Sequence, residues 1–366
     1  MKLLVIGVGD CGCRLAGEFA QLNKRARSEQ RVSIVSHAYA VNNDEASLTA
    51  IIKGNEGLQP VFIKGTLKDK SSESGAELMR EEGDRVMAAM SSSEFFETDA
   101  FLFIAGAAGS LGSGGIPVMA QRFKERYVGK PIYGLIVLPF QAEEADPRYI
   151  YNVAISLKSI NKVADAVFLI DNEKFKTSGD INSNESIAKT NKHIANLFYG
   201  LLCASETAGT PNAGANTLGV GDMMQTLSSW SAIGVGRAEL ETSKLRWGRT
   251  RNFLEKGSET IKAMEAMNMA LSLLSIDSRL EDAGRALYLL SAPITDVNVD
   301  MTKSLGSCLR ELTSDAEIRG GNFYGTKDSI QVTVVVSQLA FIDKVKDYYD
   351  RAVSLSQKLT GEKRDD

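Results

Sequence analysis

The residue types and spacing most suited to chemistry lie in a glycine-rich segment between residues 106 and 115. A short apolar run over 101–105 leads into five glycines within these ten residues, and a helix is expected over 117–127. Glycine lets a backbone turn tightly and bring its N–H groups close to an anion, and the start of a following helix adds unpaired donors. This pattern predicts a phosphate-binding loop. It lacks the Gly-Lys-Ser/Thr ending of a Walker loop and therefore indicates a different class of nucleotide binder.

A second glycine motif follows the first expected strand, where Gly7, Gly9 and Gly12 match the G-x-G-x-x-G pattern of dinucleotide-binding folds. A Rossmann oxidoreductase that uses NAD(P) is therefore an alternative interpretation. It requires an acidic residue at the end of the second strand, and Asp44 comes late for that role. Two phosphate-binding loops fit one mononucleotide held from two sides better than one dinucleotide.

Composition indicates a globular, cytoplasmic protein of about two domains. Of the 366 residues, 43% are hydrophobic and 24% are charged, and the net charge of −4 argues against nucleic acid as the main partner. No apolar run approaches the ~18–20 residues of a membrane span. The four cysteines do not make a disulfide framework in a chain this long, and the two histidines do not lie at metal-ligand spacing. We therefore expect no metal site built from side chains.

The order of the expected elements predicts an α/β fold. About the first 175 residues alternate strand-like and helix-like stretches, which is typical of a Rossmann-like parallel sheet with helices on both faces. Most of the strand candidates are continuous apolar runs, as expected for strands buried on both faces. These candidates are 2–6, 34–41, 61–63, 101–105, 132–138 and 166–170.

Polar residues follow nearly every one of these strands. Because ligands bind beyond the carboxyl ends of parallel strands, five or six loops are expected to converge on one site. A long helix over 186–204 has apolar residues at i, i+7, i+11 and i+14 counted from Ile187, and Asn191 falls inside that stripe. Burying an unpaired carboxamide costs about 1–3 kcal/mol, so Asn191 requires a partner. A purine edge would be one, with Ile187 packing on the ring.

The sequence pattern changes beyond about residue 230, and a connector precedes the change. A connector over 209–221 ends at Asp222, which is expected to cap the next helix. Beyond it, separated strands and helices predict a smaller α+β domain with a short frayed tail over 361–366. The strands are expected at 286–290 and 330–336, and the helices near 258–275, 301–312 and 340–358.

Taken together, these segments resemble the tubulin/FtsZ superfamily, and most closely its archaeal CetZ branch. The resemblance runs from Gly7 to about residue 340. The segment 106–117 is similar to the Gly-Gly-Gly-Thr-Gly-Ser-Gly signature of that family. The other matching segments are 7–12, similar to its first nucleotide loop; 40–44, its second; 138–144, its ribose loop; and 171–172 with the helix bearing Asn191, its guanine-reading positions.

The resemblance implies a GTP-binding domain over 1–185, a central helix and catalytic loop over 186–229, an α+β domain over 230–345, and a terminal helix and tail over 346–366. It also implies head-to-tail filaments of identical subunits with GTP or GDP between them and Mg²⁺ bridging the phosphates. Related tubulin/FtsZ-like paralogues are a further implied partner. A role in cell shape or division follows from the same resemblance, with membrane contact only through adaptor proteins.

The resemblance also assigns individual residues. Asp222 of one subunit helps to orient the attacking water in the site of the next. The implied nucleotide-binding residues are Gly9, Asp10, Cys11, Gly12, Asn42, Asn43, Asp44, Gly106, Gly109, Ser110, Leu111, Gly112, Ser113, Glu143, Glu144, Arg148, Asn172, Ile187 and Asn191.

Several of these residues also fit a purely structural role, and the residues alone leave both interpretations open. Either Glu143 or Glu144 meets the ribose, and the sequence does not distinguish them. The structural alternatives are a core amide for Asn191, a turn for Asn172, an acidic surface turn for Glu143 and Glu144, an ion pair with Glu144 for Arg148, and a helix N-cap for Asp222.

Departures from the family pattern predict slow hydrolysis. Leu111 stands where the family has Thr, Ala108 and Ser110 stand where it has glycines, and the polar stretch 64–75, which we expect to be mobile, lacks glycine richness. The first of two catalytic acids falls on Gly219. A positioned carboxylate is worth about 10²–10⁴ in rate. The alternative function is therefore a nucleotide-binding but hydrolysis-impaired structural or regulatory homologue.

Overall fold

The computed structural model describes residues 1–90, 93–176, 183–207, 216–240, 253–293, 297–325 and 328–362. The chain forms two compact units, each built from more than one stretch. The N-terminal unit comprises residues 2–24, 35–195 and 341–366, and the C-terminal unit comprises Met1, 25–34 and 196–340.

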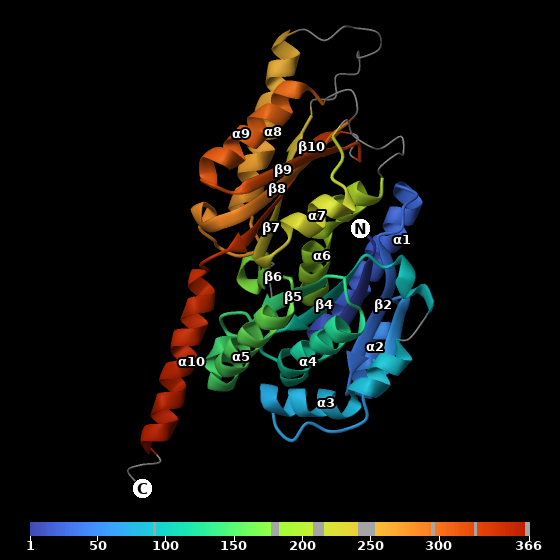
Figure 1. Ribbon diagram of the computed structural model, residues 1–366, viewed down its shortest axis with the longest axis vertical. Helices are drawn as coiled ribbons and strands as arrows, with labels where there is room; N and C mark the ends of the chain where they lie inside the picture. The colour runs from blue at the N-terminus through green and yellow to red at the C-terminus, as the bar shows by residue number, and fades with distance from the viewer. Residues whose placement is uncertain are drawn as a thin grey trace. The chain divides into compact units, whose positions relative to one another are not determined.

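The N-terminal unit contains a parallel sheet with the strand order β3-β2-β1-β4-β5-β6 (Figure 1). Val8 lies opposite Val41 on one side and Ala105 on the other, so the loops after these three strands begin at the same edge. The predicted α/β class is confirmed, and each strand predicted in this part of the chain is present. The strands are β1 (Leu3–Val8), β2 (Val35–Asn42), β3 (Leu58–Phe62), β4 (Ala100–Gly106), β5 (Ile132–Leu138) and β6 (Ala166–Asp171).

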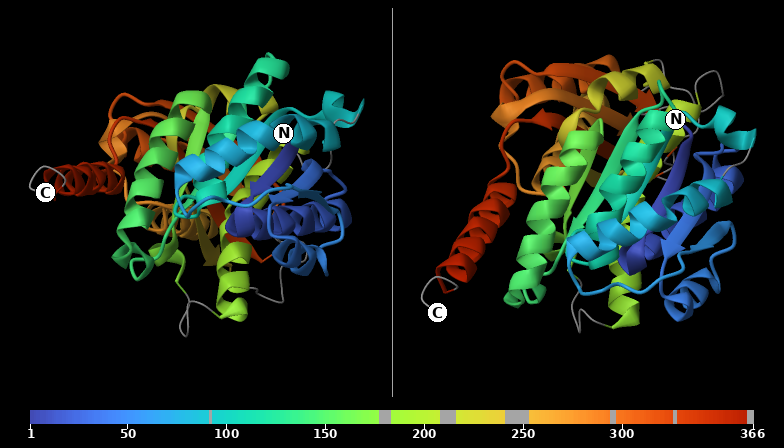
Figure 2. Two further views of the ribbon diagram at one scale, coloured as in Figure 1. Left: turned by 90° about the horizontal axis from the view of Figure 1, so that it is seen from below. Right: turned by 60° about the horizontal axis from the view of Figure 1, so that its bottom comes forward.

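Helices connect and cover these strands. Helix α3 packs along α4, α4 along α5, and α5 along α10, and Figure 2 shows α10 running beside α5. Two short 3-10 turns, η2 (Glu143–Ala145) and η3 (Asn172–Phe175), follow β5 and β6. The helices are α1 (Gly9–Glu29), α2 (Glu45–Ile52), α3 (Ser72–Ala89), α4 (Ser110–Arg126), α5 (Pro147–Val163), α6 (Asn184–Glu206) and α10 (Asp343–Glu362).

The glycine-rich segment forms mostly helix, which corrects the expected loop. Helix α4 begins at Ser110, seven residues before the predicted start, so three of the five glycines lie in its first two turns. Within 106–115 no glycine has a positive φ. A Cβ atom on Gly114 would lie 1.8 Å from the carbonyl oxygen of Ser72, and one on Gly75 would lie 2.0 Å from that of Ser110. These glycines are needed because α3 and α4 pack at backbone distance.

The C-terminal unit is the smaller α+β arrangement that was predicted. Its strands follow the order β7-β10-β8-β9, with β10 antiparallel to both neighbours. Two of these strands were not predicted, β7 and β9. The elements are α7 (Val220–Thr226), β7 (Ser229–Glu239), α8 (Phe253–Ser272), η4 (Leu280–Asp282), β8 (Ala283–Ser291), α9 (Val299–Leu312), β9 (Glu317–Phe323) and β10 (Ser329–Leu339).

Glycines explain why β7 was missed. Gly234 and Gly236 interrupt its apolar pattern and indicate a turn in the sequence. In the structure, a Cβ atom on Gly236 would lie 2.0 Å from the carbonyl oxygen of Ala266, so the glycines let α8 pack directly on the strand. In the described part of the chain, no helix is long and apolar enough to cross a membrane.

Candidate functional site

Two helix N-termini meet at the carboxyl edge of the parallel sheet. Helix α1 follows β1 directly, and α4 follows the neighbouring strand β4. A Cβ atom on Gly9 would lie 3.4 Å from the backbone nitrogen of Gly112, so the two helix starts almost touch. The first-turn N–H groups of each helix, over 9–12 and 109–112, have no carbonyl partner within the helix. Together with the positive ends of the two helix dipoles, they suit a polyphosphate.

A buried amide fixes the loop before α4. Asn152 of α5 is 1% exposed, and its Nδ2 donates to the carbonyl oxygens of Ala108 (2.8 Å) and Lys70 (2.9 Å). Its Oδ1 accepts from the backbone N–H of Ser72 at 2.9 Å. Asn152 therefore ties the segment before α3 to the segment before α4. The sequence analysis missed it, since one polar residue on an amphipathic helix has no signal of such a contact.

Residues expected at one site do meet around a cavity of about 240 Å³ beside α1 and α6. Asn172 Oδ1 and Arg14 Nε are buried there without a hydrogen-bond partner. Six predicted residues line this cavity, and Arg14 was not among the predictions. The lining residues are Asp10, Cys11, Arg14, Phe140, Glu143, Asn172, Ile187, Thr190 and Asn191.

The two unpaired atoms define what the cavity can bind. An amide oxygen requires a hydrogen-bond donor, and a guanidinium N–H requires an acceptor. A purine edge offers both. Asn191 is 7% exposed and so lies within the buried stripe, as its position predicted. The thiol of Cys11 contributes no charge, because burial and the nearby Glu143 carboxylate raise its pKa to about 12.

The neighbouring acids Glu143 and Glu144 have different surroundings. Glu143 lines the cavity, and its Oε2 accepts from the backbone N–H of Phe140 at 2.8 Å. Glu144 points instead to α10, where its carboxylate accepts from Tyr348 Oη and Arg351 Nη1, both at 2.6 Å. The structure thus leaves Glu143 as the acid that faces the cavity.

Arg148 does not line the cavity. It is exposed and forms an ion pair with Asp146 at 2.6 Å. The expected partners of Arg148 were a phosphate or Glu144, and the observed partner Asp146 is neither. The hydrogen bond between the two raises the pKa of Arg148 and lowers that of Asp146.

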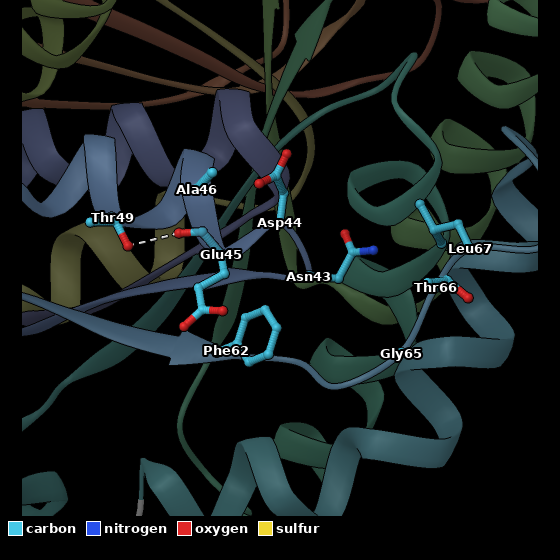
Figure 3. Close-up of a pocket in the computed structure, with 9 residues that line it drawn as sticks. All are labelled: Asn43, Asp44, Glu45, Ala46, Thr49, Phe62, Gly65, Thr66 and Leu67. Carbon is cyan, nitrogen blue, oxygen red and sulfur yellow. Dashed lines mark hydrogen bonds between the residues drawn. The ribbon is translucent and has the colours of Figure 1, made fainter.

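The residues that follow β2 have different roles: Asn42 makes a structural contact, whereas Asn43 and Asp44 line a cavity. Asn42 is 3% exposed, and its Nδ2 donates to Asp10 Oδ1 at 2.7 Å, which fixes the start of α1. Asp44 is the N-cap of α2 and accepts from the backbone N–H of Ser47. Asn43 and Asp44 line a second, open cavity of about 860 Å³, where the Glu45 carboxylate lies beside the Phe62 ring and the Asp44 carboxylate points away from it (Figure 3). Its lining residues are Asn43, Asp44, Glu45, Ala46, Thr49, Phe62, Gly65, Thr66 and Leu67.

The side chains at the start of α4 mostly face the interior. Leu111 is 5% exposed and Ser113 is fully buried, with its hydroxyl 2.7 Å from that of Ser72. The backbone N–H of Ser113 donates to Gly109. Ser110 is half-buried and Gly109 is exposed. Among the predicted residues here, Gly109 and Ser110 therefore have the most exposed surface.

Asp222 lies in the C-terminal unit, at the third position of α7. Gly219 is the N-cap, which corrects the expectation that Asp222 would be. The Asp222 carboxylate still caps the helix from inside, because its Oδ2 accepts from the backbone N–H of Gly219 at 2.9 Å. Its Oδ1 accepts from Arg319 at 2.6 Å, and Arg319 also binds Gln225 and Glu317. Arg319 was not predicted, because 97 residues separate it from its partner.

Comparisons with known proteins agree with this architecture. Residues 2–180 match the family described as "Tubulin/FtsZ family, GTPase domain", and residues 181–354 match "Tubulin-like CetZ, C-terminal domain". The chain belongs to the tubulin/FtsZ superfamily, on its CetZ branch. The family resemblance stated from the sequence is confirmed.

Individual CetZ proteins are similar over nearly the whole chain. Tubulin-like protein CetZ1 of Haloferax volcanii is 27% identical over 372 residues, which cover 96% of this chain and 92% of that protein. The GDP-bound CetZ1 monomer superposes with a TM-score of 0.79 at 24% identity, covering 97% of this chain and all of the other. The CetZ2 protofilament with bound GTPγS, also from Haloferax volcanii, gives a TM-score of 0.81 at 24% identity and covers 98% and 100%.

Proposed function

We propose that this CetZ-family chain binds GTP and GDP and assembles head-to-tail into protofilaments of identical subunits. The observation that supports binding most directly is the joint geometry of the N-terminal unit. Two helix starts offer converging N–H groups, and the adjoining cavity holds an unpaired acceptor on Asn172 and an unpaired donor on Arg14. The related structures support guanine specificity and assembly, since CetZ1 binds GDP and CetZ2 forms a protofilament with GTPγS.

In this proposal each part of the site has its own task. The backbone N–H groups over 9–12 and 109–112 hold the phosphates, and Glu143 accepts from the ribose hydroxyls. Asn172 and Asn191 read the base edge while Ile187 packs against the ring. Guanine offers N–H donors to Asn172 Oδ1, and its O6 and N7 accept from Arg14.

The proposed reaction is hydrolysis of the β–γ phosphoanhydride. The oxygen of a water bonds to the γ-phosphorus as the bond to the β–γ bridging oxygen breaks, which gives GDP and inorganic phosphate. Asp222 of the neighbouring subunit orients that water, and the N–H groups of the two helix starts stabilise the developing charge. Mg²⁺, when bound to the phosphate oxygens, neutralises part of their charge. In the described residues no three acidic, histidine or cysteine side chains gather as a metal site.

Hydrolysis-impaired binding is the second candidate, and two residues favour it. Leu111 has no hydroxyl that could donate to a phosphate, and Gly219 has no carboxylate. If these losses limit turnover, the double variant Leu111→Thr, Gly219→Asp hydrolyses GTP faster than the natural chain at equal polymer mass. Equal rates would reject this account. Such a protein would serve as a structural or regulatory partner, including in copolymers with related paralogues, in cell shape or division.

The first experiment identifies the nucleotide that the protein contains. Freshly purified protein is denatured, and the released nucleotide is separated by ion-pair chromatography. Stoichiometric GDP supports guanine binding with turnover, whereas GTP favours the hydrolysis-impaired form. An adenine nucleotide or NAD(P) would overturn the proposal.

Substitutions at Asn172 test whether its side-chain oxygen accepts a hydrogen bond from the base. Asn172→Asp retains the acceptor oxygen and is expected to keep GDP binding, whereas Asn172→Leu removes it and is expected to weaken binding about tenfold, the value of one buried hydrogen bond. Isothermal titration with GDP and ADP measures both affinity and selectivity. Equal affinity for GDP in the two variants would exclude Asn172 from the base contact.

A further inference from the structure

The C-terminal helix α10 holds both of the turns that line the base cavity. Lys344 Nζ lies 2.7 Å from Oδ1 of Asp171, which is the last residue of β6 and the N-cap of η3. One turn further along the helix, Tyr348 Oη donates to Glu144 Oε1 at 2.6 Å. Arg351 Nη1 donates to Glu144 Oε2 at 2.6 Å. Three side chains on one face of α10 thus hold Glu144, within η2, and Asp171, the N-cap of η3.

These contacts are largely shielded from water. The side chains of Asp171 and Glu144 are 9% and 11% exposed. Tyr348 is fully buried, and burial with its hydrogen bond to Glu144 raises its pKa above the usual range, so its hydroxyl remains a donor. Ion pairs and hydrogen bonds gain strength in such surroundings, and removing one partner leaves the other charge buried and unpaired.

Each held residue is next to one that faces the cavity. Glu144 follows Glu143 within η2, and Asp171 precedes Asn172 at the start of η3. The two turns are also joined to each other, because the backbone N–H of Gln141 donates to Glu173 Oε1 at 2.7 Å. A shift of α10 therefore displaces the Glu143 carboxylate and the Asn172 amide together.

We propose that α10 is a positioning element for the nucleotide, and that its attachment through Lys344, Tyr348 and Arg351 sets the affinity of the base cavity. This inference depends on the proposed function. None of the three side chains lines the cavity, so they act through Glu144 and Asp171. Because coupling between two sites is reciprocal, a bound nucleotide stabilises the docked position of α10 to the same extent.

The test compares a double variant of α10 with a matched control. Lys344→Met combined with Tyr348→Phe removes contacts to both turns without adding bulk. Ser354→Ala is the control, because Ser354 is an exposed residue of the same helix whose hydroxyl donates to the backbone carbonyl of Asp350, within α10, at 2.9 Å. Release of a fluorescent N-methylanthraniloyl GDP is measured by stopped flow. We expect release about tenfold faster in the double variant and unchanged in the control, a shift worth about 1.4 kcal/mol.

Two further readouts separate positioning from general loss of structure. In a titration with GTP the double variant is expected to keep its kcat while its KM rises, and Lys344→Arg with native Tyr348 is expected to restore the KM and the release rate of the natural chain. Hydrogen exchange over 343–357 is expected to slow on adding GDP in the natural chain and not in the double variant. Unchanged release from a double variant whose nucleotide-free Tm matches the natural chain would overturn the inference. Absence of GDP binding in the natural chain would instead reject the proposed function.

Discussion

At the scale of single residues, Gly9 requires glycine because of its backbone conformation. Its φ is +71°, and a Cβ atom would enter the gap between the starts of α1 and α4, 3.4 Å from the nitrogen of Gly112. A left-handed φ costs about 1–2 kcal/mol in other residues. We expect Gly9→Ala to lower both stability and GDP affinity, the latter by about tenfold or more.

A second glycine provides the control for Gly9. Gly129 has a φ of +89°, and nothing lies within 4 Å of its Cβ position. Gly129→Ala introduces the same kind of backbone strain away from the helix starts, so it should lower Tm and leave GDP affinity unchanged. Titration calorimetry and thermal unfolding of both variants distinguish the two effects. Equal GDP affinity in both variants would argue against phosphate binding between the helix starts.

The thiol of Cys11 gives a prediction on pH. Burial and Glu143 raise its pKa from 9.0 to about 12, so folding keeps a proton that the unfolded chain loses above pH 9. The stability from the neutral thiol is therefore fully present below pH 9 and declines as pH rises towards 12, by up to about 1.4 kcal/mol per pH unit. Urea unfolding at pH 8 and pH 10 should show a smaller pH effect in Cys11→Ser. An equal decline in both proteins would contradict the shifted pKa.

Six of the residues predicted from the sequence line the cavity of about 240 Å³, but the sequence did not predict what each of them contacts. Gly9, Asn172 and Asn191 follow strands or interrupt an apolar stripe, and such local patterns are visible in a sequence. Arg14 and Asn152 have no local signal, because their roles come from neighbours on other elements. Glu143 and Glu144 are adjacent and chemically identical, so only the position of α10 separates them.

At the scale of elements, prediction succeeded where burial is simple and failed where backbones touch. Strands buried on both faces are continuous apolar runs, and β1, β4 and β5 were found on that basis. The start of α4 and the whole of β7 were missed, since glycine inside an element is expected to disrupt it. In both places the glycine is there because a neighbouring backbone occupies the position of its side chain.

The hydrogen bonds that Asn152 of α5 makes to the segments before α3 and α4 give a prediction at this scale. Asn152→Leu keeps the volume of the side chain but leaves the Ser72 N–H and the Ala108 and Lys70 carbonyls without their partner. Each buried unpaired group costs about 1–3 kcal/mol, so for three groups we expect a loss of about 3–9 kcal/mol in the free energy of unfolding. Denaturation in urea measures it. Gln121→Leu, which removes an exposed amide bonded to Glu125, is the control and should change stability little. A small change in the free energy of unfolding of Asn152→Leu would mean that water replaces the hydrogen bonds of Asn152.

At the scale of the whole molecule, the fold was predictable because two independent features agree. The alternation of strands and helices predicted a parallel sheet, and the ordered set of loop motifs indicated the family. The interleaving of the two units was not predictable, because segments 25–34 and 341–366 each group with residues far away in the sequence. Helix α10 in particular was expected as a separate terminal element, yet it belongs to the N-terminal unit.

The last prediction concerns the assembled protein. If Asp222 acts in the site of a neighbouring subunit, GTP turnover per subunit is negligible below the concentration at which polymer forms and rises above it. Asp222→Asn should lower turnover by about 10²–10⁴ while GDP affinity is kept. Arg319 now occupies Oδ1 of that carboxylate at 2.6 Å, so Arg319→Gln, which removes the positive charge, should free the acid and raise turnover at equal polymer mass. Phosphate release and pelleting are measured together at each concentration. Turnover that is independent of protein concentration would mean that one subunit completes the site alone, and Asp222 would then have only the helix-capping role that its bond to Gly219 already shows.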